Sequence, residues 1–462
     1  MKQPGDILLI SCYELGHQPL GLASPLGFLK AAGYPAAGID AAAEKIPSSF
    51  VSSAKFIGIA VPMHTAMCIG VEISEHIRAI NPDAHLCFYG LYASLNADHL
   101  LASVADSVIG GEYEQPLLSL VQSLEAGESV PPGLRTRPHA ATLFLKRLSF
   151  AVPYRDGLPR LTQYAHLDAE GTTVPAGYVE ASRGCLHTCL HCPITPVYQG
   201  RFVVIPADVV LADICQMVDM GAQHITFGDP DFLNGPGHTL KIARRLHDAF
   251  PKVTFDITTK VEHVLEHKQV FEELKSLGCA FVVSAVESVS QIVLERLKKG
   301  HTRVDIDQAL HILNEAGIPM RPSLVAFTPW TTAADYLEML SFIEERALID
   351  HIDPVQYTIR LLVPPGSALL DQPDTESWLG PLDQNGFTYH WDHPDPRMDT
   401  LYRQVNHLVE IADNKDEDPL TTFNDIKSKY WKHFGDSWRF PLPVPISNRR
   451  RCIPKLTESW FC

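Results

Sequence analysis

The chain has 462 residues, 45% of them hydrophobic and 20% charged, which is enough for about two to four domains with cores of their own. Its 38 Lys and Arg against 54 Asp and Glu give a formal charge of −16, and this disfavours nonspecific nucleic-acid binding, which needs a positive surface. No apolar run reaches the ~18 residues of a membrane span, and the first residues resemble a strand more than a secretory signal. We therefore expect a cytoplasmic protein with reduced thiols, in which clustered Cys indicate metal binding or catalysis.

Residues 1–126 alternate short apolar runs with amphipathic stretches. Strands are expected over Asp6–Cys12, Lys55–Val61, His85–Tyr89 and Ser107–Ile109, and helices over Ser24–Ala32, Ala66–Ile80 and Glu114–Leu124. Continuous apolar strands that alternate with helices predict a doubly wound parallel sheet, covered on both faces. Such sheets bind ligands at the carboxyl ends of their strands, here in the loops after Cys12, Val61 and Tyr89.

Residues 127–175 are rich in proline and are interpreted as a linker. A second alternating series follows over residues 176–375, with strands expected near Tyr178–Ala181, Ile225–Phe227, Thr254–Ile257, Ala280–Val286, Arg321–Phe327 and Val355–Ile359. Six such units predict a curved parallel sheet or a partial (β/α)6 barrel. Residues 376–462 are predicted to form a mostly helical extension, with helices over Met398–Ile411 and Leu420–Phe434.

The sharpest feature is a group of three thiols directly after the first strand of the second series. Cys185, Cys189 and Cys192 have the spacing C-x3-C-x2-C. Three thiolates on one short loop can hold three irons of a cubane cluster and leave the fourth iron for an outside ligand. The alternative is a structural zinc site, which needs four ligands, usually as two separated pairs. No partner pair follows, because Cys215 is expected inside a helix and Cys279 at the start of a strand.

This spacing, at this place in the chain, resembles the radical S-adenosylmethionine (SAM) superfamily. The resemblance implies a [4Fe-4S] cluster held by Cys185, Cys189 and Cys192, with His191 at the position of a ring before the last Cys. It also implies that the open iron chelates SAM and that one-electron reduction cleaves SAM, usually to a 5′-deoxyadenosyl radical. A one-electron donor such as a flavodoxin or ferredoxin is then an expected partner.

Other strand ends agree with the resemblance. It places a carboxylate for the SAM ammonium after the second strand, where Asp229 stands; a helix N-cap is the alternative, and Asp231 is left open. The stretch from Ser284 to Ser288 is similar to the family's Gly-[Ile or Val]-Glu-Ser, which makes Glu287 and Ser288 expected contacts of the cofactor. Three more charged residues are expected at the same rim, with ordinary surface ion pairs as the alternative: Lys260, Glu262 and Arg360.

The first domain resembles that of cobalamin-binding radical SAM enzymes. The stretch Pro19–Leu26 is similar to their first loop and helix, and Gly110, Gly111 and Glu112 match near the end of the domain. The Asp-x-His-x-x-Gly motif that supplies a cobalt ligand elsewhere is absent from the sequence. Members of the class bind cobalamin without that His, while others bind nothing there. The resemblance therefore implies cobalamin as an expected third cofactor.

The last residues, from Arg449 to Cys462, resemble the tails of one subfamily, which finish in Cys, then Cys or selenocysteine, then Ala-Glu-Pro. Our hypothesis is that a selenocysteine codon after Cys462 was read as a stop, which would make the protein a selenoprotein. Cys452 and Cys462 are then predicted catalytic thiols that bind a thiophilic centre or resolve a redox intermediate. The alternative is an unstructured basic end.

The expected function is radical cleavage of SAM with transfer of a methyl or aminocarboxypropyl group to a small molecule, of which a thiophilic one is an option. The alternative is an iron–sulfur or zinc protein that binds or senses redox state without turnover. The charge of −16 and the lack of an appended basic domain weaken RNA modification, so neither nucleic acid nor membrane is an expected partner.

Overall fold

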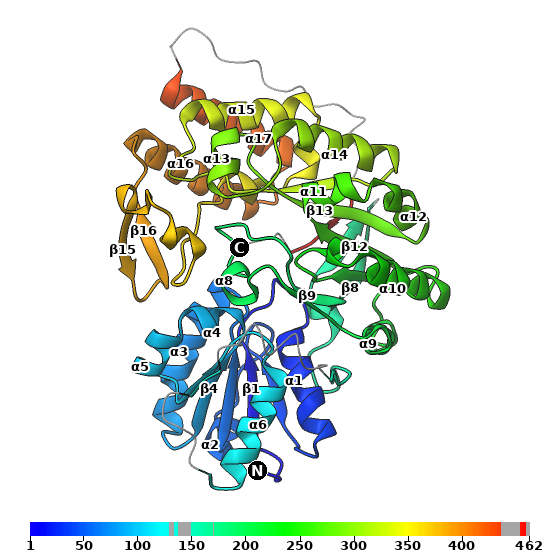
Figure 1. Ribbon diagram of the computed structural model, residues 1–462, viewed down its shortest axis with the longest axis vertical. Coiled ribbons are helices and arrows are strands. Elements are labelled where there is room, and N and C mark those ends of the chain that lie inside the picture. The colour runs from blue at the N-terminus through cyan, green and yellow to red at the C-terminus, as the bar shows by residue number, and fades with distance from the viewer. Residues whose placement is uncertain (129–133, 137–148, 170, 436–452, 459–462) are drawn as a thin grey trace.

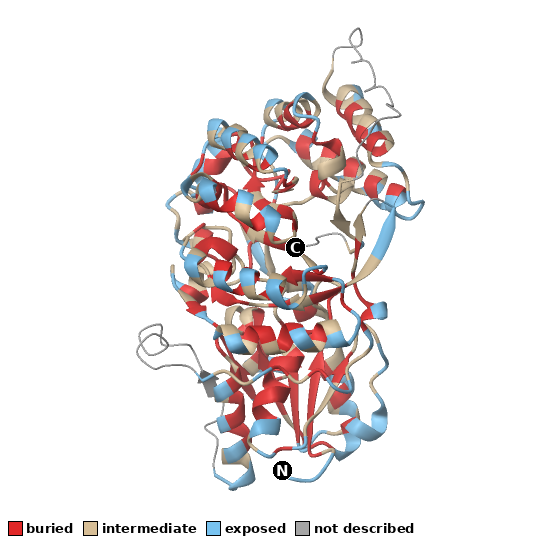
Figure 2. Cartoon of the chain, turned by 90° about the vertical axis from the view of Figure 1, so that its right-hand side faces the viewer, coloured by how far each residue is buried: buried red, intermediate tan, exposed pale blue. Residues whose placement is uncertain are grey.

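The computed structural model describes residues 1–128, 134–136, 149–169, 171–435 and 453–458. The N-terminal α/β domain lies at one end of the molecule, and a curled half barrel stacks on it (Figure 1). A mostly helical C-terminal part lies beside the barrel. Buried residues fill both sheets, while the outer faces of the helices are exposed (Figure 2). Among the described residues, every helix is too short or too polar to cross a bilayer.

The first sheet is parallel throughout, in the order β2-β1-β3-β4-β5-β6. Its strands are β1 (Ile7–Ser11), β2 (Ala37–Asp40), β3 (Phe56–Ala60), β4 (His85–Tyr89), β5 (Ser107–Ile109) and β6 (Leu134–Thr136). The helices are α1 (Leu20–Ala31), α2 (Ser48–Ser53), α3 (His64–Ile80), α4 (Leu91–Leu95), α5 (Ala97–Ser103) and α6 (Glu114–Glu125). Strands β1 and β3 are buried along their whole length, with one apolar cluster on each face of the sheet, so the predicted doubly wound class is confirmed.

The second sheet has the order β14-β13-β12-β11-β8-β7-β17. Its parallel strands are β8 (Thr172–Val179), β11 (His224–Phe227), β12 (Thr254–Thr259), β13 (Cys279–Glu287) and β14 (Met320–Leu324). The helices outside them are α9 (Ala207–Asp219), α10 (Pro236–Ala249), α11 (Val261–Glu266), α12 (Phe271–Ser276), α13 (Gln291–Arg296), α14 (Arg303–Glu315) and α15 (Ala333–Glu345). The sheet curls into an open half barrel, which confirms the predicted fold class.

Two elements differ from the sequence prediction. The expected sixth strand over 355–359 is wrong: Pro354–Tyr357 form a 3-10 helix, and a single bridge between Phe327 and Arg360 is all that remains of the pairing. Pro354 favours this outcome because it lacks an N–H for a ladder and suits a first helical turn. The span interpreted as a linker contains β7 (His166–Ala169), which pairs antiparallel with β8.

The C-terminal part comprises a hairpin of β15 (Leu379–Asp383) and β16 (Thr388–Trp391), followed by α16 (Pro396–Asp413) and α17 (Pro419–Phe434). Each helix starts with an Asp cap and a Pro in its first turn, at Asp395 and Asp418. The chain then returns to the barrel, where β17 (Lys455–Leu456) pairs antiparallel with β7 and forms the last strand of the sheet.

Candidate functional site

The cysteine loop leaves the barrel at the carboxyl end of β8. It starts at β9 (Ser182–Gly184), which pairs antiparallel with β10 (Phe202–Val204), and it ends at α8 (Thr195–Tyr198). Gly184 has φ +80°, and a Cβ there would lie 2.5 Å from the Tyr198 ring and 2.6 Å from the Arg201 carbonyl oxygen. Only glycine fits this close approach, so Gly184 fixes the direction in which the loop leaves the barrel.

The three thiols of the loop are free, with Cys189 buried and Cys185 and Cys192 partly buried. In the described part of the chain, the sulfur atoms of these three cysteines do not all lie within 4.8 Å of one another. A tetrahedral zinc ion needs thiolates about 3.8 Å apart, so the loop suits a larger cluster better. Burial raises the pKa of Cys185 to about 12 and of Cys192 to about 11, so metal assembly here releases protons.

Asp229 lies at the base of the loop and is fully buried. Its two oxygens accept hydrogen bonds from the Ala181 N–H (2.9 Å) and the Ser182 hydroxyl (2.6 Å). Burial raises the pKa of this carboxyl to about 7. The contacts that the structure gives Asp229 therefore hold the link between β8 and β9, while its predicted role toward SAM stays a prediction.

Glu287 lies near the cysteine loop, at the end of β13. Its carboxylate is 3.1 Å from the Lys299 ammonium and 3.6 Å from His191 Nε2, and its backbone φ is +61°. Burial opposes its ionisation, but Lys299 and His191 hold the pKa of the carboxyl down to about 2. Ser288, next along the chain, accepts a hydrogen bond from the Ser290 N–H and shapes this turn. The structure thus brings the end of β13 together with the loop.

Lys260 and Glu262 follow β12 and pair with each other. Lys260 also donates to the Lys299 carbonyl oxygen at 2.7 Å, which connects the end of β12 to the loop after α13. Arg360 lies elsewhere: its guanidinium stacks 3.6 Å over the Trp391 ring and pairs with Asp399 at 2.8 Å, both in the C-terminal part. The structure therefore does not bring Arg360 together with the other predicted residues.

Cys452 and Cys462, the predicted tail thiols, lie outside the described residues. Between these two cysteines the structure describes residues 453–458, which include β17. Glu458, two residues beyond this strand, accepts a hydrogen bond from the Tyr13 hydroxyl at 2.8 Å, in the loop after β1. The tail therefore contacts both domains.

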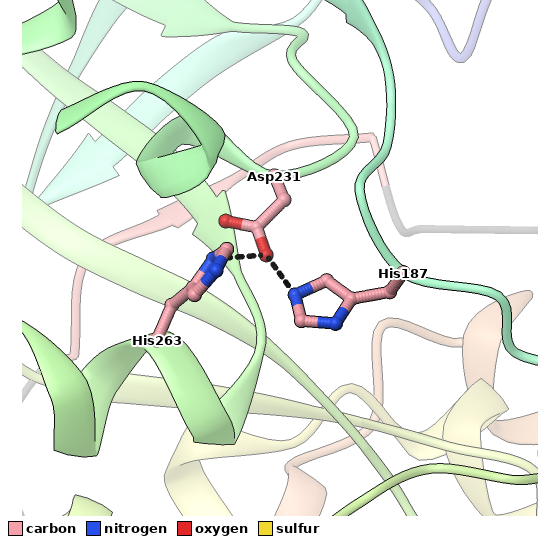
Figure 3. Close-up of side chains that lie close together, drawn as sticks. All are labelled: His187, Asp231 and His263. Carbon is pink, nitrogen blue, oxygen red and sulfur yellow. Dashed lines mark ion pairs between the residues drawn. The ribbon is translucent and has the colours of Figure 1, made fainter. Parts of the chain in front are cut away.

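Two histidines that the sequence analysis did not single out contact Asp231. His187, between Cys185 and Cys189, and His263, on α11, both point at this carboxylate (Figure 3). The Nε2 of His187 is 3.5 Å and the Nδ1 of His263 is 2.8 Å from the same oxygen of Asp231. The position of His187 inside the cysteine motif is the only sequence signal for this group.

An ion cluster joins the two domains beneath the loop. Arg183 pairs with Glu112 (3.1 Å) and Glu114 (2.6 Å) of the first domain and with Glu180 (2.6 Å) of the second. Tyr198 donates to Glu112 at 2.7 Å. Beside this interdomain ion cluster is a cavity of about 220 Å³, lined by the loops after β1, β3, β4 and β5 and by the start of the cysteine loop.

Fold and site together define an α/β half-barrel protein with a three-thiol loop at the barrel mouth and a doubly wound domain facing it. Residues 179–342 match the radical SAM superfamily, so the chain contains a radical SAM domain. Such a domain implies a [4Fe-4S] cluster and SAM as cofactors, and the free thiols of the loop provide a donor set of the right chemistry.

Relatives match the chain in part. A hopanoid C-3 methylase from Methylococcus capsulatus is 23% identical over 277 residues, which cover 56% of this chain and 50% of that protein. A tRNA-2-methylthio-N(6)-dimethylallyladenosine synthase from Shewanella denitrificans is 24% identical over 231 residues, 47% of each chain. The chain thus spans about half the length of these curated relatives.

Solved structures match more of the fold. The cobalamin-dependent radical SAM enzyme OxsB, with aqua-cobalamin bound, has a TM-score of 0.64 at 14% identity, covering 88% of this chain and 67% of that chain. The radical SAM methyltransferase TsrM from Kitasatospora setae, with cobalamin and a [4Fe-4S] cluster bound, has a TM-score of 0.60 at 15% identity, covering 75% and 74%. At these identities the likeness establishes the two-domain fold.

Proposed function

We propose that this protein is a radical SAM enzyme that cleaves SAM reductively and transfers a group derived from it to a small molecule. The observation that carries the proposal is the three-thiol loop at the carboxyl end of β8, inside a radical SAM domain. Cys185, Cys189 and Cys192 would hold the [4Fe-4S] cluster. When bound, the cluster supplies the electron that cleaves SAM, and an external one-electron donor has to replace it.

The residues around the loop would position it for this chemistry. Asn234 accepts from the Leu186 N–H at 3.1 Å and donates to the Gly184 carbonyl oxygen at 3.3 Å, which fixes the start of the loop. The Leu190 N–H donates to the Leu297 carbonyl oxygen at 3.0 Å, which fixes its far side. These bonds limit the freedom of the cysteines before any cluster is assembled.

Five side chains are proposed to contact SAM from the ends of the strands: Asp229, Lys260, Glu262, Glu287 and Ser288. Glu287 and Lys299 together present a buried carboxylate and a buried ammonium beside the loop. Such a pair matches a ligand that carries both an ammonium and a carboxylate. Lys299 is therefore a further candidate contact, although the sequence analysis gave it no role.

Methyl transfer is the first of two proposed routes. It is supported by the methylases among the relatives and by the position of the first domain, whose ligand-binding edge faces the barrel mouth. In the cobalamin enzymes of this fold the cofactor would mediate that transfer. A cavity of about 220 Å³ between the domains is lined by the loops after β1, β3, β4 and β5, which is the edge where a doubly wound sheet binds its ligand, so these loops would hold cobalamin.

Transfer of the aminocarboxypropyl group of SAM is the second route, and this route needs no corrinoid. The interdomain ion cluster fills the neighbouring space with buried charged side chains, since Arg183, Glu112 and Glu114 are each less than 9% exposed. A soft acceptor held by the tail thiols would suit this route, and those thiols remain predicted.

Mass spectrometry of the SAM-derived products, with anaerobically reconstituted and reduced protein, tests the proposal. We expect about four irons and four sulfides per chain, and SAM cleavage that Cys189→Ala abolishes and that Cys215→Ala, the exposed thiol on α9, leaves intact. 5′-Deoxyadenosine indicates the usual radical cleavage, whereas methylthioadenosine indicates aminocarboxypropyl transfer. Zinc alone without SAM cleavage would support a binding or redox-sensing protein instead.

A further inference from the structure

We propose that His187, Asp231 and His263 form a mononuclear site for a divalent transition-metal ion, separate from the cysteine cluster. The three side chains come from three elements: the cysteine loop, the turn after β11, and α11. Their ligand atoms all lie within 4.8 Å of one another. Two imidazoles and one carboxylate form a donor set that zinc and ferrous iron prefer.

The distances suit a small ion. The Asp231 oxygen is 3.5 Å from His187 Nε2 and 2.8 Å from His263 Nδ1. Ligands that bind zinc at about 2.0–2.2 Å lie about 3.3 Å apart in a tetrahedral site, and the two measured distances fall on either side of that value. Small side-chain rotations would therefore complete the site.

His187 Nε2 and His263 Nδ1 both pair with the Asp231 carboxylate, but neither contact has the geometry of a hydrogen bond (Figure 3). Both nitrogens are buried, and so is Asp231. A metal ion between the three side chains would use the lone pairs of the two nitrogens and the charge of the carboxylate.

The outer contacts orient the ligands as metal sites require. One oxygen of Asp231 accepts from the Thr259 hydroxyl (2.7 Å) and the Leu233 N–H (3.0 Å), while the oxygen that faces the two imidazoles accepts a longer hydrogen bond from the Lys260 N–H (3.3 Å). On the other side of the His187 ring, Nδ1 is 3.4 Å from Glu262. A carboxylate behind a ligating imidazole is the common outer arrangement in metal sites. Partial exposure of His187 leaves a route for the ion from solvent.

Because His187 lies between two cysteines of the loop, the ion would tie the cluster loop to the rim of the barrel. With three protein ligands, the ion keeps positions for water or for an oxygen or nitrogen donor of a substrate. The bound ion would thus be a Lewis acid beside the cysteine loop. The proposal does not require the cluster, so the two can be tested apart.

The test uses the full chain with Cys185, Cys189 and Cys192 all replaced by Ala, titrated with Co²⁺ and then Zn²⁺. We expect one Co²⁺ per chain, with visible ligand-field bands and without thiolate-to-cobalt charge transfer, and displacement by Zn²⁺. In the same background, His187→Gln, Asp231→Asn and His263→Gln should each weaken Co²⁺ binding at least about tenfold. His267→Gln, at the end of the same helix as His263, is the matched control and should bind normally.

Of the three ligand variants, His187→Gln is the least prone to misfold, because the His187 side chain is partly exposed on a loop. Circular dichroism of every variant identifies any that fails to fold. Absence of Co²⁺ binding in the folded triple-Ala protein would overturn the proposal and leave an ion pair between Asp231 and His263. Loss of binding in His267→Gln but not in Asp231→Asn would move the site to the neighbouring group of His263, Glu266 and His267. Neither result depends on SAM cleavage.

Discussion

Arg155 is the residue whose removal should destabilise this protein most clearly. Its guanidinium makes a two-pronged pair with Asp213 on α9 (2.9 and 2.8 Å) and donates to the carbonyl oxygens of Tyr178 (2.9 Å) and Gln18 (3.3 Å). Arg155 and Asp213 are 1% and 4% exposed. One side chain therefore joins the first domain, the connecting segment and the barrel.

The expected cost of Arg155→Met follows from these contacts. A buried carboxylate left without its partner costs about 3–5 kcal/mol. Two carbonyl acceptors that lose a donor add about 1 kcal/mol each. The total is about 5–7 kcal/mol, and it corresponds to a fall in melting temperature of about 10–30 °C for a barrel of this size.

The double variant Arg155→Met/Asp213→Leu isolates the carboxylate. It should recover about 3 kcal/mol of the loss, because no buried charge is left unpaired. Arg244→Met, which breaks the exposed pair with Glu273, serves as the control and should change stability by less than about 1 kcal/mol. Thermal unfolding of the four proteins, followed by circular dichroism, gives the comparison. A double variant as unstable as Arg155→Met would refute this reasoning.

Three more predictions concern the site and its supports. Burial raises the pKa of Glu14 to about 8, above its unfolded value of about 4.3, so this group's stabilising contribution is lost as pH rises toward 8. Raising the pH from 6 to 8 should therefore lower the free energy of unfolding of the wild type by up to about 3 kcal/mol more than that of Glu14→Gln, with a larger fall in melting temperature, and equal falls would contradict this. Gly184→Ala should lower the iron content after reconstitution, whereas Gly237→Ala, whose added Cβ meets open space, should not; normal iron in Gly184→Ala would show that the loop tolerates the change. Thr457→Pro removes an N–H that donates to the His166 carbonyl oxygen at 2.8 Å, so hydrogen exchange should quicken in β7. Thr457→Ser keeps that N–H and the hydroxyl that accepts from the His166 N–H at 3.0 Å, so exchange in β7 should stay slow.

Apolar runs long enough to form buried strands predict most of both sheets. The runs at Asp6–Cys12 and Ala280–Val286 contain β1 and most of β13, because a strand buried on both faces is apolar along its whole length. Strands β2 and β7 are short and lie near sheet edges, so their local pattern is weak. Nothing local marks β17, because its partner is far away in the sequence.

The sequence likewise predicts one part of the candidate site and misses another. Three cysteines on one loop are visible as a spacing, so the iron–sulfur prediction needs no tertiary information. The contact of His187 with Asp231 and His263 needs three separate elements to converge, and no spacing encodes it. Arg155 is one charged residue in a proline-rich stretch, and its importance comes only from the buried groups around it.

The pairing of β17 with β7 has a consequence for how the protein is made. His166 and Thr457, which bond across this edge, are 291 residues apart. At about 5–20 residues per second on a ribosome, β7 emerges roughly 15–60 s before its partner. During that time the edge of the nascent barrel presents unpaired N–H and C=O groups, which favour pairing with other chains. Slow translation or crowded expression should therefore raise aggregation through this edge, and Asp168, a charge within β7, is placed where it opposes that pairing.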